Sequence, residues 1–218
     1  MVKVERNPVA PTSLAQEKAN GTTNYRGFDV VQQLREDFHE KCYLCEIDKV
    51  QDPQIEHLKA HHNGQDRDRM FDWNNLFFSC SHCNSIKNRR IYEESILDCC
   101  REEPERYISQ ELLGSHVRVL PLNESDEARM TAQLITECFE RTNTGIRIHA
   151  CNIRVNALQE TMSIFYRNLC EYAKDPTPKI KATLLGMLDR SYKFAGFTRT
   201  YIRQHIEDYP FLVDAIAL

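Results

Sequence analysis

Apolar residues recur at helical spacing along most of the second half of the chain. Between residues 152 and 173 they alternate steps of four and three, which places Leu158, Met162, Phe165, Leu169 and Tyr172 on one face of a helix. Similar patterns predict helices over residues 28–41, 104–113, 125–142, 179–192 and 198–207. Residues 117–122 indicate a short strand or extended link. For the apolar tail, residues 210–218, we prefer closure of the helical core over contact with a partner.

Two stretches lack this periodicity. Residues 1–27 are polar and carry four prolines and glycines, so we expect an irregular arm laid over another surface. Residues 42–90 hold two close cysteine pairs and most of the informative histidines. The chain therefore divides into an arm (1–27), a metal-bearing module (28–100) and a helical domain (101–218).

Composition narrows the class of protein. Of the 218 residues, 41% are hydrophobic and 28% are charged, as in soluble globular proteins. No apolar run approaches the roughly 18 residues of a membrane span, and the N-terminal region lacks the apolar core of a signal peptide. We therefore expect a cytoplasmic protein without membrane contact. Nine cysteines, an odd number without an export signal, favour metal binding over disulfides.

The cysteine pairs are Cys42 with Cys45, and Cys80 with Cys83. Two C-x-x-C pairs supply the four tetrahedral thiolates that a structural zinc ion prefers. The 34 residues between the pairs exceed the usual spacing of roughly 15–20, so the insertion has a role of its own. Two alternatives are that His82 replaces one cysteine ligand, and that the thiols are unrelated.

The insertion carries the residues of a hydrolytic site. Glu56 and His57 are adjacent, and Asn84 directly follows the last cysteine. A zinc site would hold Asn84 on rigid backbone, so that its amide oxygen can be aimed at a harder ion. Magnesium prefers oxygen ligands, here Glu56 and Asn84. His57 could take a proton from the attacking water, and together these groups would hydrolyse a phosphodiester.

These motifs resemble the HNH (ββα-metal, His-Me finger) endonuclease family in "IEH" (55–57), Asn75-Leu76 and "CSHCNSIK" (80–87). The resemblance implies two strands and a helix around a catalytic Mg²⁺ or Mn²⁺, with "LFFSC" as the second strand. It implies Glu56 and Asn84 as ligands of that ion, His57 as general base, and Asn75 as the residue that fixes the loop bearing the base. The expected fold class is α+β and mostly helical: a small ββα-metal module with a zinc site of four cysteines, followed by a helical domain.

Some assignments within the module stay open. The family often has a proline soon after the acid–histidine pair, and this chain has none there. His61 or His62 could therefore replace His57 as the base, and Asn74 could exchange roles with Asn75. Lys87, Arg89 and Arg90 form a basic strip that predicts contact with nucleic-acid phosphates, or else a solvated face.

The order "CYLCE", "IEH", "DWNNL" and "CSHCNSIK" is similar to the PtuB-like HNH nucleases of Septu and retron antiphage systems. This resemblance implies DNA as substrate and a PtuA-like ATPase as partner, and it leaves a homo-oligomer open. Residues 42–90 carry seven basic and seven acidic side chains, so we expect the module alone to have little affinity for DNA. A partner with a basic channel would supply the missing charge. The alternatives are a non-catalytic zinc-ribbon module that binds nucleic acid or protein, and a helical scaffold with incidental cysteines.

Overall fold

The insertion between the cysteine pairs contributes two paired strands, and a helix that carries Cys83 follows the second strand. In the computed structural model, which describes residues 1–218, β1 (Pro53–His57) pairs antiparallel with β2 (Leu76–Cys80), so that Glu56 lies opposite Phe77. All residues of β2 are buried, as expected for a short apolar run without alternation. The helix α4 (Ser81–Lys87) follows at once and contacts both strands. The predicted second strand is confirmed.

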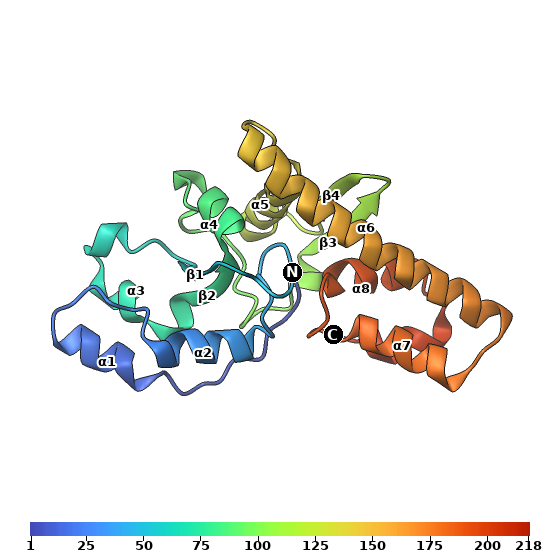
Figure 1. The fold of residues 1–218 in the computed structure, drawn as a ribbon, viewed down its shortest axis with the longest axis horizontal. Coiled ribbons are helices and arrows are strands. Elements are labelled where there is room, and N and C mark those ends of the chain that lie inside the picture. Colours follow the sequence, from blue (N-terminus) through green and yellow to red (C-terminus); the bar gives the residue numbers. More distant parts are fainter.

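The N-terminal region flanks this unit. α1 (Thr12–Ala19) and α2 (Phe28–Asp37) pack against each other, α2 contacts β2, and α1 contacts α3 (Arg67–Phe71) of the insertion (Figure 1). The prediction of a wholly irregular arm was wrong, because α1 lies within it and Leu14 is buried. The helix predicted from residue 28 exists, but Phe28 is 79% exposed while Val30 and Leu34 are buried.

A helix predicted over residues 104–113 was also wrong. A single 3-10 turn, Pro104–Arg106, precedes β3 (Ile108–Leu113), which pairs antiparallel with β4 (His116–Pro121). Pro104 suits a first helical turn, but Gly114 adopts a left-handed φ of 64° and turns the chain into a hairpin. The extended stretch predicted at 117–122 is confirmed by β4, in which Val117 and Val119 are buried.

Four helices complete the chain: α5 (Asp126–Glu140), α6 (Gly145–Lys174), α7 (Pro178–Leu188) and α8 (Ala195–Gln204). The Ser125 hydroxyl accepts a 3.2 Å hydrogen bond from the Ala128 amide, which caps α5 as its sequence indicates. α7 folds back along α6 (Figure 1). The tail forms a 3-10 turn, Pro210–Ile216, beside α7 and α8 with Leu212 and Ile216 buried, which is the expected core closure.

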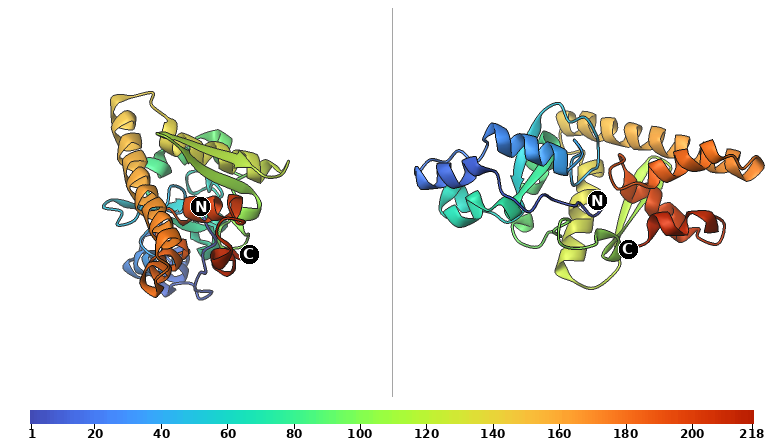
Figure 2. Two further views of the ribbon diagram at one scale, coloured as in Figure 1. Left: turned by 90° about the vertical axis from the view of Figure 1, so that its right-hand side faces the viewer. Right: turned by 90° about the horizontal axis from the view of Figure 1, so that it is seen from below.

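The two halves of the molecule share one continuous cluster of buried apolar side chains, although the molecule is elongated (Figure 2). α4 packs on α5, and the Glu46 carboxylate accepts hydrogen bonds from the Gly196 amide of α8. The fold is thus α+β, with mainly helices and two two-stranded sheets. Although α6 has 30 residues, none of the helices combines the length and apolarity that crossing a membrane requires.

Candidate metal centre and active site

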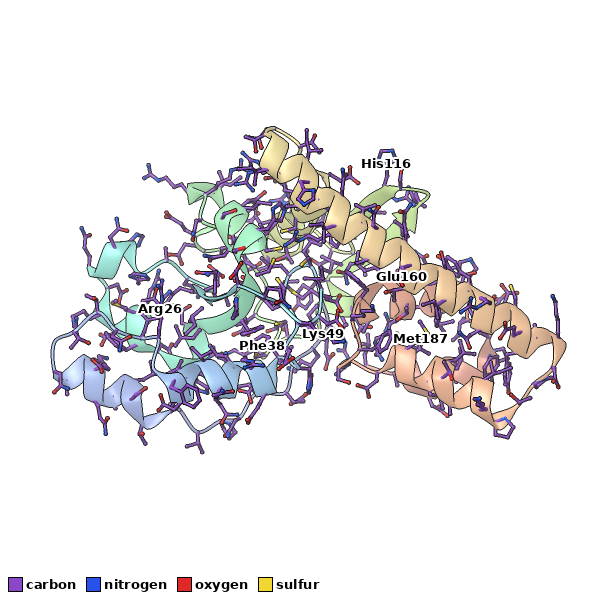
Figure 3. All side chains as sticks on the ribbon, viewed as in Figure 1. Arg26, Phe38, Lys49, His116, Glu160 and Met187 are labelled. Atoms are coloured by element: carbon purple, nitrogen blue, oxygen red, sulfur yellow. The ribbon has the colours of Figure 1, made fainter.

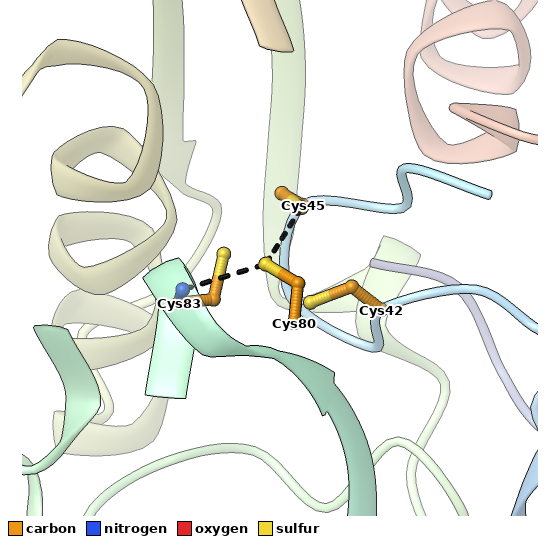
Figure 4. Close-up of side chains that lie close together, drawn as sticks. All are labelled: Cys42, Cys45, Cys80 and Cys83. Atoms are coloured by element: carbon orange, nitrogen blue, oxygen red, sulfur yellow. Dashed lines mark hydrogen bonds between the residues drawn. The ribbon is translucent and has the colours of Figure 1, made fainter. Parts of the chain in front are cut away.

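Cys42, Cys45, Cys80 and Cys83 form a buried cluster whose sulfur atoms all lie within 4.8 Å of one another (Figure 4). Zinc–sulfur bonds of about 2.3 Å in a tetrahedron place sulfurs roughly 3.8 Å apart. The Cys45–Cys80 sulfur distance is 4.0 Å, so the cluster could hold a structural metal such as zinc. His82 is not part of it, since its Nε2 lies 3.0 Å from the carbonyl oxygen of Cys138.

A buried arginine from the helical half contacts this cluster. Arg154 Nη2 donates a 2.8 Å hydrogen bond to Cys80 Sγ, and Arg154 is only 6% exposed. Hydrogen bonds from Cys42 and the other thiols, together with the Arg154 charge, hold the pKa of Cys80 well below its ordinary value. Sequence reasoning missed Arg154. The signal was available, because it lies in the apolar stripe of α6 between Cys151 and Leu158.

Glu56, near the end of β1, is held from two sides. Tyr43 Oη donates a 2.6 Å hydrogen bond to its Oε2, and Lys87 Nζ lies 3.0 Å from its Oε1. Burial raises the pKa of Glu56, while the Lys87 charge and the Tyr43 hydroxyl act in the opposite direction. The carboxylate is therefore fixed in place, with lone pairs left on both oxygens.

The predicted basic strip is mostly engaged within the protein. Lys87 is 3% exposed, and its ammonium also donates 2.7 Å hydrogen bonds to the carbonyls of His57 and Leu58, so all three of its N–H groups have partners. Arg89 pairs with Glu137 and lies over the Tyr92 ring. Arg90 is exposed. The contacts of Lys87 therefore hold Glu56 and the end of β1 in position.

His57 ends β1 and is 7% exposed. Its Nε2 lies 3.1 Å from the Met70 carbonyl oxygen, and because a carbonyl only accepts, Nε2 carries the proton and Nδ1 keeps a free lone pair. Burial lowers the pKa of His57 to about 4, so the ring is neutral at pH 7. The ring centroids of Tyr25 and His61 lie 4.6 Å and 4.3 Å from that of His57.

Asn75 is buried under the loop that joins β1 to α3. Its Oδ1 accepts a 2.8 Å hydrogen bond from the Lys59 amide, and its Nδ2 donates to the carbonyls of Lys59 at 3.0 Å and Arg69 at 2.9 Å. Asn74 is exposed, and its side chain makes no such bonds. Between these neighbours, Asn75 is the one that fixes the loop beside His57.

Glu56, His57 and Asn84 line one cavity of about 610 Å³, from β1 on one side and α4 on the other. Most of its wall is polar. His61 and His62 also line it, but His61 Nδ1 already accepts a 2.8 Å hydrogen bond from the Gly64 amide. Two further sets of residues complete the lining: Tyr25 and Arg26 from the segment before α2, and Ile55, Ala60, Asn63, Gln65, Lys87, Asn88 and Glu93.

Sequence reasoning had no signal for Tyr25 and Arg26, since they lie far along the chain from the rest of the site.

No protein-family model matches the chain, and a search of curated proteins found no match. The interpretation of the cavity therefore rests on its residues and their geometry.

Proposed function

We propose that this protein is a metal-dependent HNH endonuclease that hydrolyses DNA phosphodiester bonds. The observation that carries the proposal is that Glu56 and His57 at the end of β1 and Asn84 on α4 line one polar cavity, where α4 directly follows the strand that pairs with β1. In this reading β1, β2 and α4 form the ββα-metal module.

His57 is the general base in this mechanism. The Met70 carbonyl holds Nε2–H, so Nδ1 is the atom that accepts the proton of the attacking water. Because burial lowers the pKa of His57 to about 4, the base is deprotonated at neutral pH without help from another group. The contacts of Tyr25 and His61 limit rotation of the ring.

Glu56 and Asn84 offer one carboxylate and one amide oxygen, a donor set that suits a Mg²⁺ or Mn²⁺ ion. The Asn84 side chain makes no hydrogen bond within the protein, and Glu56 is fixed by Tyr43 and Lys87, so both are ready to bind. A divalent ion bound there would offset negative charge on the phosphate and on the leaving oxygen. Lys87 and Tyr43 thus serve to orient the carboxylate.

Zinc bound by the four cysteines would have a structural role. Cys83 lies in the first turn of α4, just before Asn84, while Cys42 and Cys45 flank Tyr43 and Leu44 between α2 and β1. Binding would hold Asn84 and Tyr43 at fixed positions relative to β1. A missing zinc ion would therefore loosen both the amide oxygen and the hydroxyl that holds Glu56.

We further propose an ATPase partner, as part of an antiphage defence assembly. Residues 42–90 have equal numbers of acidic and basic side chains, and Lys87 and Arg89 are already paired. Affinity for DNA depends on net positive charge, which this module lacks. A partner with a basic channel would supply it, so cleavage and its salt dependence should differ between the protein alone and the assembly.

The decisive experiment is cleavage of plasmid DNA with and without Mg²⁺ or Mn²⁺. His57→Ala should lower the rate at least roughly 100-fold, the contribution expected of a general base, while zinc content and circular dichroism stay unchanged. His116→Ala is a matched control, because His116 is an exposed histidine at the start of β4 and lies away from Arg26, which lines the cavity (Figure 3). Full cleavage by His57→Ala would exclude His57 as the base. No metal-dependent cleavage by the native chain, alone or with an ATPase encoded beside it, would favour the non-catalytic zinc module.

A further inference from the structure

The segment between α1 and α2 forms one wall of the cavity through Tyr25 and Arg26. The Tyr25 ring stands edge-on to the His57 ring, at a centroid distance of 4.6 Å and an interplanar angle of 77°. Arg26 is exposed and belongs to the same half of the molecule as β1 and α3 (Figure 3). This segment is thus part of the site, although it is remote from the module in sequence.

The Arg26 guanidinium contacts the neighbouring Tyr25 side chain and makes no other hydrogen bond within the protein. Its Nη2 donates a 2.9 Å hydrogen bond to Tyr25 Oη, and its Cζ lies 5.0 Å from the Tyr25 ring centroid. It forms no ion pair with a carboxylate. An arginine has five N–H donors, so one hydrogen bond leaves enough for two parallel bonds to an anion.

The backbone of the segment is also anchored. The Arg26 amide donates a 3.2 Å hydrogen bond to Asn24 Oδ1, and Arg67 of α3 donates to the carbonyls of Thr22 at 2.9 Å and Lys18 at 3.0 Å. These bonds tie the segment to the insertion that carries the cavity. Arg26 is therefore presented to the cavity from a fixed position.

Two other cations near the cavity, Lys87 and Arg89, already have partners within the protein. Lys87 lines the cavity, but its N–H groups contact Glu56 and two backbone carbonyls, and Arg89 is paired with Glu137. Glu56 and Glu93 add negative charge to the wall. An entering phosphate would meet Arg26 as the uncommitted cation, and a guanidinium matches the geometry of two phosphate oxygens.

We infer that Arg26 binds a phosphate of the nucleic-acid substrate in the cavity, with the Tyr25 hydroxyl orienting its guanidinium. The inference rests on the proposed nuclease function and names one substrate-binding residue of that site. Arg26 would fix the position of the phosphate relative to His57, and its charge would favour the anionic substrate over water in the cavity.

The test compares Arg26→Ala and Arg26→Lys with Arg35→Ala, which removes a half-buried arginine of α2 that pairs with Glu40 outside the cavity. With a short DNA duplex and Mg²⁺, Arg26→Ala should lower kcat/KM at least roughly tenfold, the loss expected for one charged hydrogen bond. Arg26→Lys should recover part of the lost kcat/KM, because lysine restores the positive charge but not the two parallel N–H donors of a guanidinium. Tyr25→Phe, which keeps the ring and removes the hydroxyl, should give a smaller loss, and Arg35→Ala should match the native chain.

A binding measurement separates this inference from the proposed function. In the His57→Ala background, adding Arg26→Ala should weaken binding of a fluorescent DNA duplex and reduce the salt dependence by about one phosphate contact. If the native chain cleaves DNA but Arg26→Ala and Arg35→Ala behave alike in both assays, the inference is wrong and the nuclease function stands. If the native chain cleaves neither alone nor with an ATPase encoded beside it, the proposed function fails, and the binding measurement alone decides the role of Arg26: unchanged binding in Arg26→Ala would overturn it.

Discussion

Arg154, in the first half of α6, donates a 2.8 Å hydrogen bond from its Nη2 to Sγ of Cys80, at the end of β2. This bond joins the helical half of the molecule to the candidate metal centre. A zinc ion with four thiolates carries two excess negative charges, which are costly to bury without a counter-charge. Arg154 provides that charge, and its Nη1 is fixed by a 2.7 Å bond to the Ala150 carbonyl.

Arg154→Met should therefore weaken zinc binding. The side chain keeps its apolar volume but loses its charge and its bond to Cys80, and loss of such an outer partner costs roughly 10–100-fold in metal affinity. Competition with a chelator measures the change. Arg167→Met, on an exposed face of the same helix, is the control and should leave the affinity as in the native chain. Equal affinity of both variants would show that Arg154 does not support the site.

A second prediction concerns Gly196 of α8, which contacts Glu46, the residue directly after Cys45. A Cβ there would overlap Nε2 of Gln110 and Oε1 of Glu46, and both side chains are buried and hydrogen-bonded, so neither can move aside freely. Gly196→Ala should lower the free energy of unfolding by about 1–3 kcal/mol.

Gly186→Ala is the matched control for that substitution. Gly186 lies within α7 with open space around it, so the added methyl should raise the free energy of unfolding by about 0.5–1 kcal/mol through helix propensity. Urea titrations of the two variants and the native chain measure both effects. The same sign for both would mean that the close approach at Gly196 is not a packing constraint.

Local signals explain which parts of the fold could be predicted from the sequence. The second strand and the two cysteine pairs depend on residues close together in the chain: β2 is confirmed, and the four cysteines form a buried cluster that could hold a structural metal. Strand β3 was mistaken for part of a helix because Pro104 opens a 3-10 turn as readily as a helix. That β3 is a strand depends on its pairing with β4 across Gly114, which no helical periodicity reveals.

The site shows the same limit. Glu56, His57 and Asn84 could be named from adjacent motifs, and they do line one cavity. Whether Lys87 points outward or inward depends on how α4 sits on β1, and the structure turns it inward to Glu56. Tyr25 reaches His57 only through the packing of the α1–α2 segment on the insertion, a contact between remote parts of the chain.

A third prediction concerns acid stability. Partial burial acts to raise the pKa of Glu137, but hydrogen bonds from Arg89, Arg141 and Tyr92 lower it to about 2. A carboxyl whose pKa is lower when folded adds stability above its unfolded value of about 4.3, and this stability disappears as the pH falls toward 2. Glu137→Gln should thus cost about 1–3 kcal/mol at pH 7 and progressively less below pH 4.

Urea titrations of the native chain and Glu137→Gln across this pH range measure the difference. Glu124→Gln replaces an exposed glutamate that forms no ion pair and controls for the general effect of charge. A gap between native chain and Glu137→Gln that stays constant from pH 7 to about pH 2.5 would contradict the ion-pair origin of the stability.

The last prediction separates two adjacent asparagines. Asn75 Nδ2 binds the Arg69 carbonyl, and the next carbonyl, of Met70, holds Nε2 of His57. Asn75→Ala should therefore cost about 1–3 kcal/mol of stability from unpaired backbone groups, and it should also free the loop that orients His57. Cleavage should fall by more than the loss of folded protein explains, because misorientation of a base by about 1 Å costs up to roughly 100-fold in rate.

Asn74→Ala tests the same prediction from the other side. Asn74 is exposed, so its removal should change neither the free energy of unfolding nor the cleavage rate beyond error. Melting curves and plasmid cleavage on both variants, normalised to folded protein, distinguish the two positions. If Asn74→Ala lost cleavage while Asn75→Ala kept it, the two residues would have exchanged roles, and the hydrogen bonds from Asn75 to Lys59 and Arg69 would stabilise the loop without orienting the base.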